Sequence, residues 1–343
     1  MVLDCKSWGD NMNKTFKFIR YILPWIFIII VAMILLTKIA TIEKAAEVIR
    51  ALPIWMLCLA ALSQVISYMG SGYQINVIVS NGLKRISTVR GALITIAGET
   101  VGLAGGMAGS VAATYLWVAK DKEMADEGVL SGVMPIIYNS VVLIAFSIIG
   151  MAYLLVNHAL SLIQIFFYGL TLAILLLGIL VILYGLFRKQ KIEWLVLKVT
   201  QLNNRYRKSK MDFVQIKKRL DHFYDSLGLI KRKGWAKIGI GTIINVGFDI
   251  VTIYIFFAAS GYNISPGILV AGYCLSFLLG RTIFFIPGGS GIVEGGMVAI
   301  FINLGVPGYI SVVAALGYRF LSFWLPSLIG VLIMFYLQRD TEK

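Results

Sequence analysis

Apolar runs of membrane-spanning length recur along the whole chain. They cover residues 21–37, 52–79, 91–119, 129–156, 160–187, 236–259 and 267–337. An α-helix needs about 20 apolar residues to cross a hydrocarbon core of roughly 30 Å. The pattern therefore predicts an all-α, polytopic membrane protein, and the last run is long enough to contain several elements.

The lysines and arginines of short loops indicate how the chain is oriented in the membrane, because short loops rich in these residues stay in the cytoplasm. They place residues 1–20 inside as a cytoplasmic N-terminus, together with 84–90 and a basic segment at 188–235. The tail at 339–343 is also expected inside. Counting spans from the basic segment puts both ends of 91–119 on the cytoplasmic side and both ends of 267–308 on the outside.

A segment that starts and ends on one side of the membrane is a re-entrant hairpin. The run 91–119 has 29 residues, too few for two crossings, whereas half-helices of about 13 residues would each reach roughly 20 Å. The membrane halves 21–187 and 236–338 each contain a span, such a hairpin and a further span, so we expect two inverted repeats, a transporter architecture. The expected breaks are Gly105, Gly106 and Gly109 in the first hairpin, and Pro287, Gly288, Gly289 and Gly291 in the second.

Broken helices at membrane depth are tolerated only where protein or a water-filled cavity surrounds them. The two breaks therefore predict a polar cavity between the hairpins. The alternative is close helix packing, because the glycines also form small-xxx-small pairs. Pro287, directly before the second glycine run, favours a true break.

Few ionisable residues lie inside the apolar runs, where each costs roughly 2.5–3.5 kcal/mol on insertion scales. A planar guanidinium in a cavity suits phosphate, so we expect two arginines to bind it and a glutamate to orient or pair with them. Arg281 and Glu294 flank the second break and could face each other, although a purely structural ion pair is equally compatible. Asp249 and Glu99 could bind a proton or another cation, or cap a backbone amide. The candidate substrate-binding residues are Arg281, Glu294, Arg319, Tyr318, Asp249 and Glu99.

The net charge of +14 is concentrated in one place. Residues 188–237 hold fifteen Lys or Arg against four Asp or Glu, which contributes +11. A basic segment between two spans favours an anionic leaflet, not nucleic acid, as its partner. An apolar stripe from Phe213 to Leu227 predicts a helix along the membrane surface, which serves positive-inside anchoring or, alternatively, recruits lipid headgroups.

The sequence offers no catalytic machinery and no cofactor or metal site. The two histidines, His158 and His222, lie far apart, and the three cysteines have no metal-ligand spacing. No nucleotide-binding loop is present. We therefore expect neither an enzyme nor an ATP-driven pump.

Three stretches resemble the flippase-like transmembrane domain of lysylphosphatidylglycerol synthases, in the multiple peptide resistance factor family. They are residues 285–297 (FIPGGSGIVEGGM), 303–307 (NLGVP) and 315–326 (ALGYRFLSFWLP). The resemblance extends over about residues 24–338. At the first break it is weaker, since Ala104 stands where the family usually has proline. The family-typical positions are Pro287, Gly288, Gly289, Gly291, Glu294, Tyr318 and Arg319.

The resemblance implies a domain that flips aminoacylated phosphatidylglycerol, after a separate soluble domain transfers lysine from charged tRNA. The chain ends six residues after Leu337, so we expect no transferase domain in it. We predict a flippase-like transporter in the plasma membrane that moves an anionic or aminoacylated phospholipid between leaflets. The alternatives are a secondary transporter of a soluble solute, and a membrane subunit that supports a separate synthase. Whether the chain forms a homo-oligomer stays open.

Overall fold

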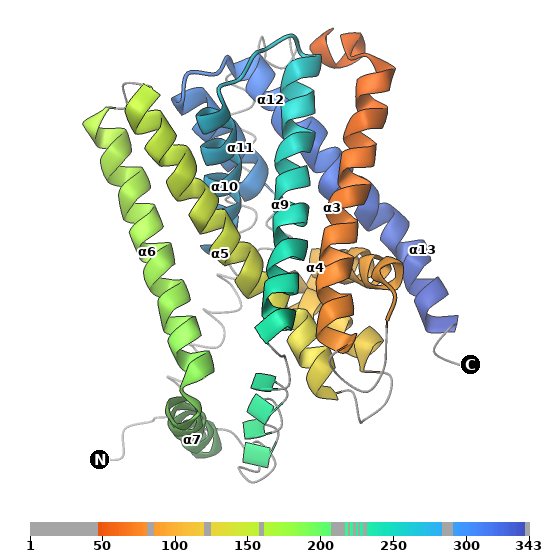
Figure 1. Cartoon of the computed structure of the whole chain (residues 1–343), viewed down its shortest axis with the longest axis vertical. Helices are drawn as coiled ribbons and strands as arrows, with labels where there is room; N and C mark the ends of the chain where they lie inside the picture. The colour runs from red at the N-terminus through yellow and green to blue at the C-terminus, as the bar shows by residue number, and fades with distance from the viewer. Residues whose placement is uncertain are drawn as a thin grey trace, which may run out of the picture.

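The computed structural model describes residues 47–80, 86–119, 125–157, 161–206, 232–282 and 291–339, with the pairs 217–218, 220–221, 224–225 and 227–228. All regular structure in these residues is helical, which confirms the predicted all-α fold (Figure 1). The expected first span, 21–37, lies outside the described residues. The elements are α3 (Ile54–Ser80), α4 (Thr88–Val118), α5 (Ala125–Asn157), α6 (Leu162–Phe187), α7 (Lys189–Tyr206), α9 (Arg232–Ala259), α10 (Pro266–Thr282), α11 (Ile292–Asn303), α12 (Gly308–Arg319), the π-helical turn η3 (Phe320–Trp324) and α13 (Leu325–Arg339).

The long helices coincide with the predicted spans. Four described helical stretches are long and apolar enough to cross a membrane, namely Ile54–Ser80, Glu127–Asn157, Gly234–Ala259 and Gly308–Gln338. The last of these joins α12, η3 and α13 into one rod. The 26-residue helix α6 carries no charged residue and matches the expected span at 160–187. The chain is therefore a multi-pass membrane protein.

The distribution of polar and apolar side chains supports the same conclusion. Gln74, Thr252 and Ser276 are completely buried, whereas Val156 and Leu162 are each 84% exposed. A water-soluble protein buries its large apolar residues and exposes its amides and hydroxyls. Here an apolar core is present as well, but amides and hydroxyls are buried among the helices while other large apolar side chains are exposed, which suits a protein surrounded by hydrocarbon.

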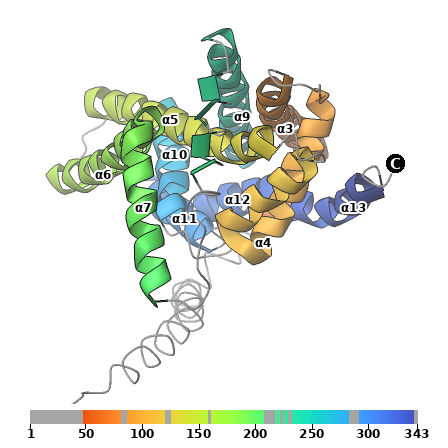
Figure 2. The ribbon, with the colours of Figure 1, turned by 90° about the horizontal axis from the view of Figure 1, so that it is seen from below.

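Among the described helices, α3 and α9 pack together most extensively, and they lie side by side in both views (Figures 1 and 2). Glycines bring the two backbones together: a Cβ at Gly70 would lie 2.8 Å from the Gly241 carbonyl oxygen, and a Cβ at Gly241 would lie 2.9 Å from that of Gly70. Any side chain at either position would push the helices apart. Polar residues on the two facing surfaces can therefore reach each other directly.

The backbone of α4 breaks at the predicted double glycine. Gly106 has φ 62° and ψ −157°, a conformation outside the helical region that is open essentially to glycine alone. Beyond it the chain turns back, since a Cβ at Gly98 would lie 3.0 Å from Oγ1 of Thr114. In a straight helix, 16 residues would separate these two positions by about 24 Å. α4 is therefore a helical hairpin that turns at Gly106, and its re-entrant placement in a membrane stays a prediction.

The close-packing alternative fits the neighbouring glycines only in part. A Cβ at Gly109 would lie 3.2 Å from the carbonyl oxygen of Val101, so this glycine does allow the two arms of α4 to approach. A Cβ at Gly105 would meet nothing within 4 Å. The same is true of Gly295, which forms a small-xxx-small pair with Gly291 in the second hairpin. Packing thus explains one member of the pair Gly105/Gly109, and the backbone break explains Gly106.

Helices α10 and α11 form a second hairpin. A side chain at Gly272 would collide with Phe301, and one at Gly280 would collide with Val293, which is the register of two antiparallel helices. Gly291, with φ 84°, is the N-cap residue directly before α11. The predicted Pro287, Gly288 and Gly289 lie outside the described residues. The depth of both hairpins in a bilayer, and their relation as inverted repeats, stay predictions.

The expected surface helix in the basic segment is corrected in one respect. Leu227 is buried against Ile78, Leu130 and Ile238, and Tyr224 packs onto the same cluster. This end of the apolar stripe therefore covers the ends of the spans instead of facing lipid. The helix α7 stands crosswise to α6, seen end-on in Figure 1 and lengthwise in Figure 2.

An ion pair connects two parts of the basic segment. The ammonium of Lys189, at the start of α7, lies 2.7 Å from the carboxylate of Asp221. The hydrogen bond to Asp221 raises the pKa of Lys189 above its ordinary value. Both side chains are exposed, so the pair contributes little to stability. It does show that α7 and the later part of the segment lie against each other.

Candidate functional site

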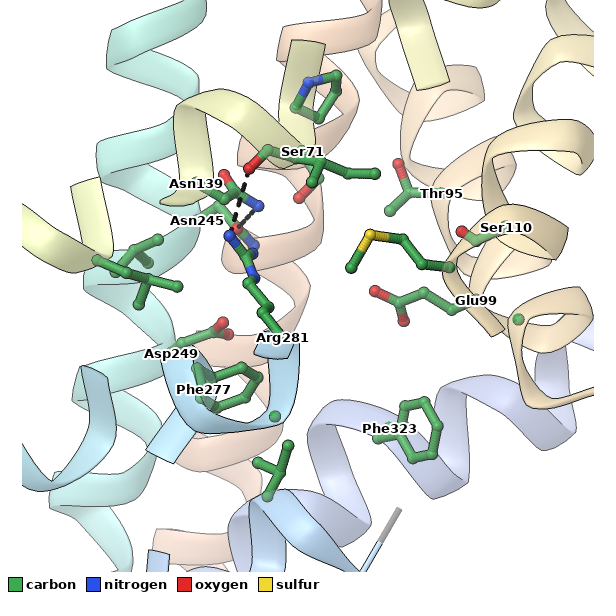
Figure 3. A pocket seen from close by; sticks show the side chains of 18 of the residues that line it. Ser71, Thr95, Glu99, Ser110, Asn139, Asn245, Asp249, Phe277, Arg281 and Phe323 are labelled. Carbon is green, nitrogen blue, oxygen red and sulfur yellow. Dashed lines mark hydrogen bonds between the residues drawn. The ribbon is translucent and has the colours of Figure 1, made fainter. Parts of the chain in front are cut away.

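A cavity of about 320 Å³, lined by polar and apolar side chains together, lies where the α4 hairpin meets α3, α5, α9 and α10 (Figure 3). Four of the predicted site residues line it, although they come from four different helices. In Figure 3, Glu99 reaches in from one side, and Arg281 and Asp249 lie on the other. The polar and charged lining residues are Ser71, Thr95, Glu99, Ser110, Thr114, Ser131, Asn139, Asn245, Asp249, Tyr273, Arg281 and Arg319.

Two predicted site residues, Glu294 and Tyr318, are not on the cavity wall but directly behind it. Oε1 of Glu294 accepts a hydrogen bond from Nε of Arg319 at 2.8 Å. Oε2 accepts one from the backbone N–H of Gly291 at 2.6 Å. Both carboxylate oxygens therefore accept a hydrogen bond. We infer that Glu294 has a structural role, because it fixes the side chain of Arg319 and the start of α11.

The predicted contact between Arg281 and Glu294 is wrong. They flank the same break in sequence, but the side chain of Arg281 turns away from α11 and donates to the hydroxyl of Ser140 and, at 3.3 Å, to the carbonyl of Ile136. Glu294 pairs instead with Arg319, the other arginine of the predicted site. No described carboxylate forms an ion pair with Arg281.

Arg319 lines the cavity with a guanidinium group, one of whose nitrogen atoms has no hydrogen-bond acceptor among the described residues. The residue is 4% exposed, and its guanidinium carbon lies 4.1 Å from the centre of the Phe323 ring. Among the described residues, Nη2 of Arg319 has no hydrogen-bond partner. A buried donor without a partner costs about 1–3 kcal/mol, and more when it is charged. The site is therefore suited to an anion that would complete the guanidinium's hydrogen bonds.

Arg281 brings a second cation to the cavity from the last turn of α10, where the helix dipole favours positive charge. Its side chain extends toward Asn139 and Asn245, whose amides are hydrogen-bonded at 3.3 Å (Figure 3). All the hydrogen-bond partners of Arg281 that the structure describes are neutral oxygens. This guanidinium is consequently not neutralised locally, unlike that of Arg319.

Asp249 is held at the α3–α9 contact by neutral donors. Its Oδ1 accepts from the hydroxyl of Ser67 at 2.7 Å and the amide of Gln64 at 3.0 Å. Its Oδ2 accepts from the hydroxyl of Tyr273 at 2.8 Å, and Tyr318 in turn donates to Tyr273 at 3.4 Å. Tyr318 thus acts on Asp249 through Tyr273.

Glu99 occupies the opposite side of the cavity, on the first arm of the α4 hairpin. Its Oε2 lies 2.6 Å from the hydroxyl of Tyr68, and that hydroxyl also lies 2.8 Å from the backbone carbonyl of Ser322 in η3. Pro326, four residues after Ser322, has no N–H and cannot make the helical hydrogen bond to this carbonyl. One tyrosine therefore links α3, α4 and the π-helical turn.

Comparison with known proteins places the chain in a family. The family model for the lysylphosphatidylglycerol synthase TM region matches residues 23–330. The chain belongs to this family. Among curated relatives, the UPF0104 membrane protein MJ1595 of Methanocaldococcus jannaschii is 25% identical over 166 residues, 48% of this chain and 49% of that protein. A UPF0104 membrane protein of Methanothermobacter thermautotrophicus is 32% identical over 95 residues, 28% of each chain.

These matches span half or less of the two relatives, whereas the family model covers most of the membrane-embedded part of the chain. The resemblance stated from residues 285–326 is thereby confirmed at the level of the family. All the described residues of the cavity wall lie within the matched range 23–330.

Sequence analysis missed several residues of the site, although a signal was present. Polar residues recur along α3 at spacings of three or four, which places them on one face of a helix. A similar series, Asn245, Asp249 and Thr252, runs along α9. A polar stripe inside an apolar span predicts a face turned toward other polar groups. The α3 stripe consists of Gln64, Ser67, Tyr68, Ser71 and Gln74.

Proposed function

We propose that this protein moves a phospholipid, or another lipid-linked amphiphile, between the leaflets of a membrane. The headgroup passes through the polar cavity while the acyl chains stay in the surrounding lipid. The observation that carries this proposal is the guanidinium of Arg319, which is almost completely buried at the cavity wall with Nη2 unpartnered among the described residues. An anionic headgroup would supply the missing acceptor.

Phosphate is the anion best suited to the two arginines. A guanidinium presents donors in a planar fork that matches phosphate oxygens, and charge-assisted bonds of this kind are stronger than neutral ones. Arg281 and Arg319 line the same cavity from different helices, so one phosphate group can be passed between them. Hydroxyls and amides on the wall can bond the uncharged part of a headgroup.

The size of the cavity supports a headgroup as its occupant. At roughly 30 Å³ per water molecule, 320 Å³ holds about ten waters, enough for a phosphodiester with a small polar group. An acyl chain that reaches half of the roughly 30 Å hydrocarbon core extends about 15 Å and needs the bilayer itself. The family description names lysylphosphatidylglycerol, so aminoacylated phosphatidylglycerol is the first lipid to test. We assign transport, and not lysyl transfer, to this chain.

The test is leaflet exchange in vesicles that contain the purified protein and head-labelled phosphatidylglycerol, followed with a membrane-impermeant quencher. We expect Arg281→Gln to slow exchange at least about tenfold, because a hydrogen bond to a charged group contributes about 1.5–3 kcal/mol. Lys198→Gln, which removes an exposed cation on α7, is the matched control and should leave the rate unchanged. Equal rates for wild type and Arg281→Gln would overturn the proposal.

The orientation of the hairpin can be tested independently. We place both ends of the chain in the cytoplasm of a plasma membrane, with both ends of α4 on the cytoplasmic side. Single cysteines at Arg90 and Ala119 should then react with an impermeant thiol reagent from the same side. Reaction from opposite sides would show that α4 crosses the membrane, and the re-entrant assignment would be wrong.

A second candidate function is transport of a soluble solute driven by protons or sodium. It is favoured by Asp249, a carboxylate at the cavity that meets only neutral donors among the described residues. Glycerophosphoglycerol, which has the same phosphodiester but no acyl chains, separates the two functions. Gradient-driven uptake of this solute without any lipid exchange would favour the second candidate.

A further inference from the structure

The hydroxyl of Tyr68 lies between two oxygen acceptors, although it has only one hydrogen to donate. It is 2.6 Å from Oε2 of Glu99 and 2.8 Å from the carbonyl oxygen of Ser322, both normal hydrogen-bond lengths. Tyr68 is buried, so bulk water does not supply the missing hydrogen. The arrangement is complete only if one of the neighbouring groups brings a proton of its own.

Only Glu99 can bring it, because a backbone carbonyl has no proton. With Glu99 ionised, the tyrosine hydrogen goes to the carboxylate, and two lone-pair oxygens, those of Tyr68 and Ser322, then face each other at 2.8 Å. With Glu99 protonated, its O–H donates to Tyr68 and Tyr68 donates to Ser322. The protonated form turns both contacts into hydrogen bonds.

From this geometry we propose that Glu99 is a proton-binding site, and that its proton and the headgroup anion bind the cavity together. The inference rests on the proposed function, which supplies the anion. Besides Glu99, the charged residues on the described part of the cavity wall are Arg319 on α12, Asp249 on α9 and Arg281 on α10. The lining residues of α5 carry no charge, and α13 meets the same arm of α4 through the Ser327 carbonyl, which accepts from Thr100 at 3.2 Å.

Charge balance gives the direction of the coupling. Glu294 neutralises Arg319, which leaves Arg281 against Asp249 and Glu99. When Glu99 holds a proton, these remaining charges cancel and an anion enters a neutral cavity. When Glu99 is ionised, the anion enters a cavity with a net charge of −1. Anion binding therefore favours protonation of Glu99, and by reciprocity the proton strengthens anion binding.

Tyr68 connects the proton-binding residue Glu99 structurally to the helix turn next to Arg319. Ser322 lies in η3, the π-helical turn that begins directly after Arg319, and π-turns within helices are frequent at functional sites. Loss of the Glu99 proton withdraws the Tyr68 hydrogen from Ser322 and so loosens the contact between α3 and η3. Protonation thus acts on the segment that carries the anion-binding arginine.

The experiment is calorimetric titration of the full-length protein with dihexanoyl-phosphatidylglycerol, in pairs of buffers that differ in ionisation enthalpy. A phosphodiester stays anionic near neutral pH, so any proton uptake belongs to the protein. We expect about one proton taken up per lipid at alkaline pH, with the affinity falling about tenfold per pH unit. In Glu99→Gln, whose amide can still donate to Tyr68, uptake and pH dependence should both disappear.

Glu193→Gln on α7 makes the same chemical change away from the cavity and should behave as wild type. An affinity that does not vary with pH in wild type would overturn the inference, and this outcome needs no variant. Proton uptake that persists in Glu99→Gln would also overturn it, because the proton would then reside elsewhere. Failure of wild type to bind the lipid would instead count against the proposed function.

Discussion

The two glycine-rich hairpins carry one glutamate each, and the structure uses the two carboxylates differently. Glu294, three residues into the second arm of the α10–α11 hairpin, is held by a guanidinium and a backbone N–H. Glu99, on the first arm of the α4 hairpin, meets one shared tyrosine hydroxyl. A buried carboxylate with fixed positive and backbone donors stabilises structure. One with a single neutral donor among the described residues retains the freedom to change its protonation state.

The largest effect that the comparison predicts is on stability. Glu294→Ala should lower the free energy of unfolding by about 3–5 kcal/mol, since it leaves the buried guanidinium of Arg319 without its counterion. Unfolding of the purified protein in detergent would measure this. The double variant Glu294→Met with Arg319→Met should recover most of the loss, because it removes both charges. If Glu294→Ala unfolds like wild type, the structural role given to Glu294 is wrong.

A smaller effect should follow from the backbone break in α4. Gly106→Ala places a side chain in a conformation that only glycine adopts easily, and should cost about 1–3 kcal/mol. Gly105→Ala is the matched control: its Cβ meets nothing within 4 Å, and alanine favours helix by roughly 0.5–1 kcal/mol. Opposite signs for neighbouring glycines would confirm the break, and equal effects would contradict it.

The smallest effect should be that of Glu99→Gln on stability. The glutamine amide can donate to Tyr68 much as a protonated glutamate does, so the change should stay within about 1 kcal/mol, the size of one neutral hydrogen bond. The same unfolding measurement applies to both glutamates. A loss as large as that of Glu294→Ala would mean that Glu99 is an ionised structural partner, and the contrast between the hairpins would disappear.

Much of the fold could be predicted from the sequence, because few backbone structures satisfy their hydrogen bonds inside a bilayer. Uninterrupted apolar runs predicted α3, α5, α6 and α9 to within a few residues of their observed ends. The double glycine at Gly105 and Gly106 predicted the break in α4, since glycine is what such a backbone conformation requires. The second predicted break stays untested, because residues 283–290 lie outside the described residues.

The partners within the site were less predictable, because they depend on packing between distant helices. Arg281 and Glu294 are 13 residues apart in sequence and do not meet, whereas Glu294 and Arg319, 25 residues apart, do. The apolar stripe ending at Leu227 was assigned to the membrane surface, but its described end, Tyr224 and Leu227, packs against protein. An amphipathic pattern indicates that one face of a helix is removed from water, but it does not indicate whether lipid or protein covers that face.

The glycine contact between α3 and α9 limits where this protein can move. Gly70 and Gly241 bring the two helices into backbone contact, and side chains on both sides fasten them, including Ser63 to the Phe248 carbonyl and Gln64 to Thr252. Pulling these two rods apart would strip many polar groups of partners inside hydrocarbon. If the protein transports a headgroup as we propose, we expect α3 and α9 to stay together during any rearrangement that admits it. We expect any bending to occur instead where the helical backbone is irregular, at Gly106 and at the π-helical turn.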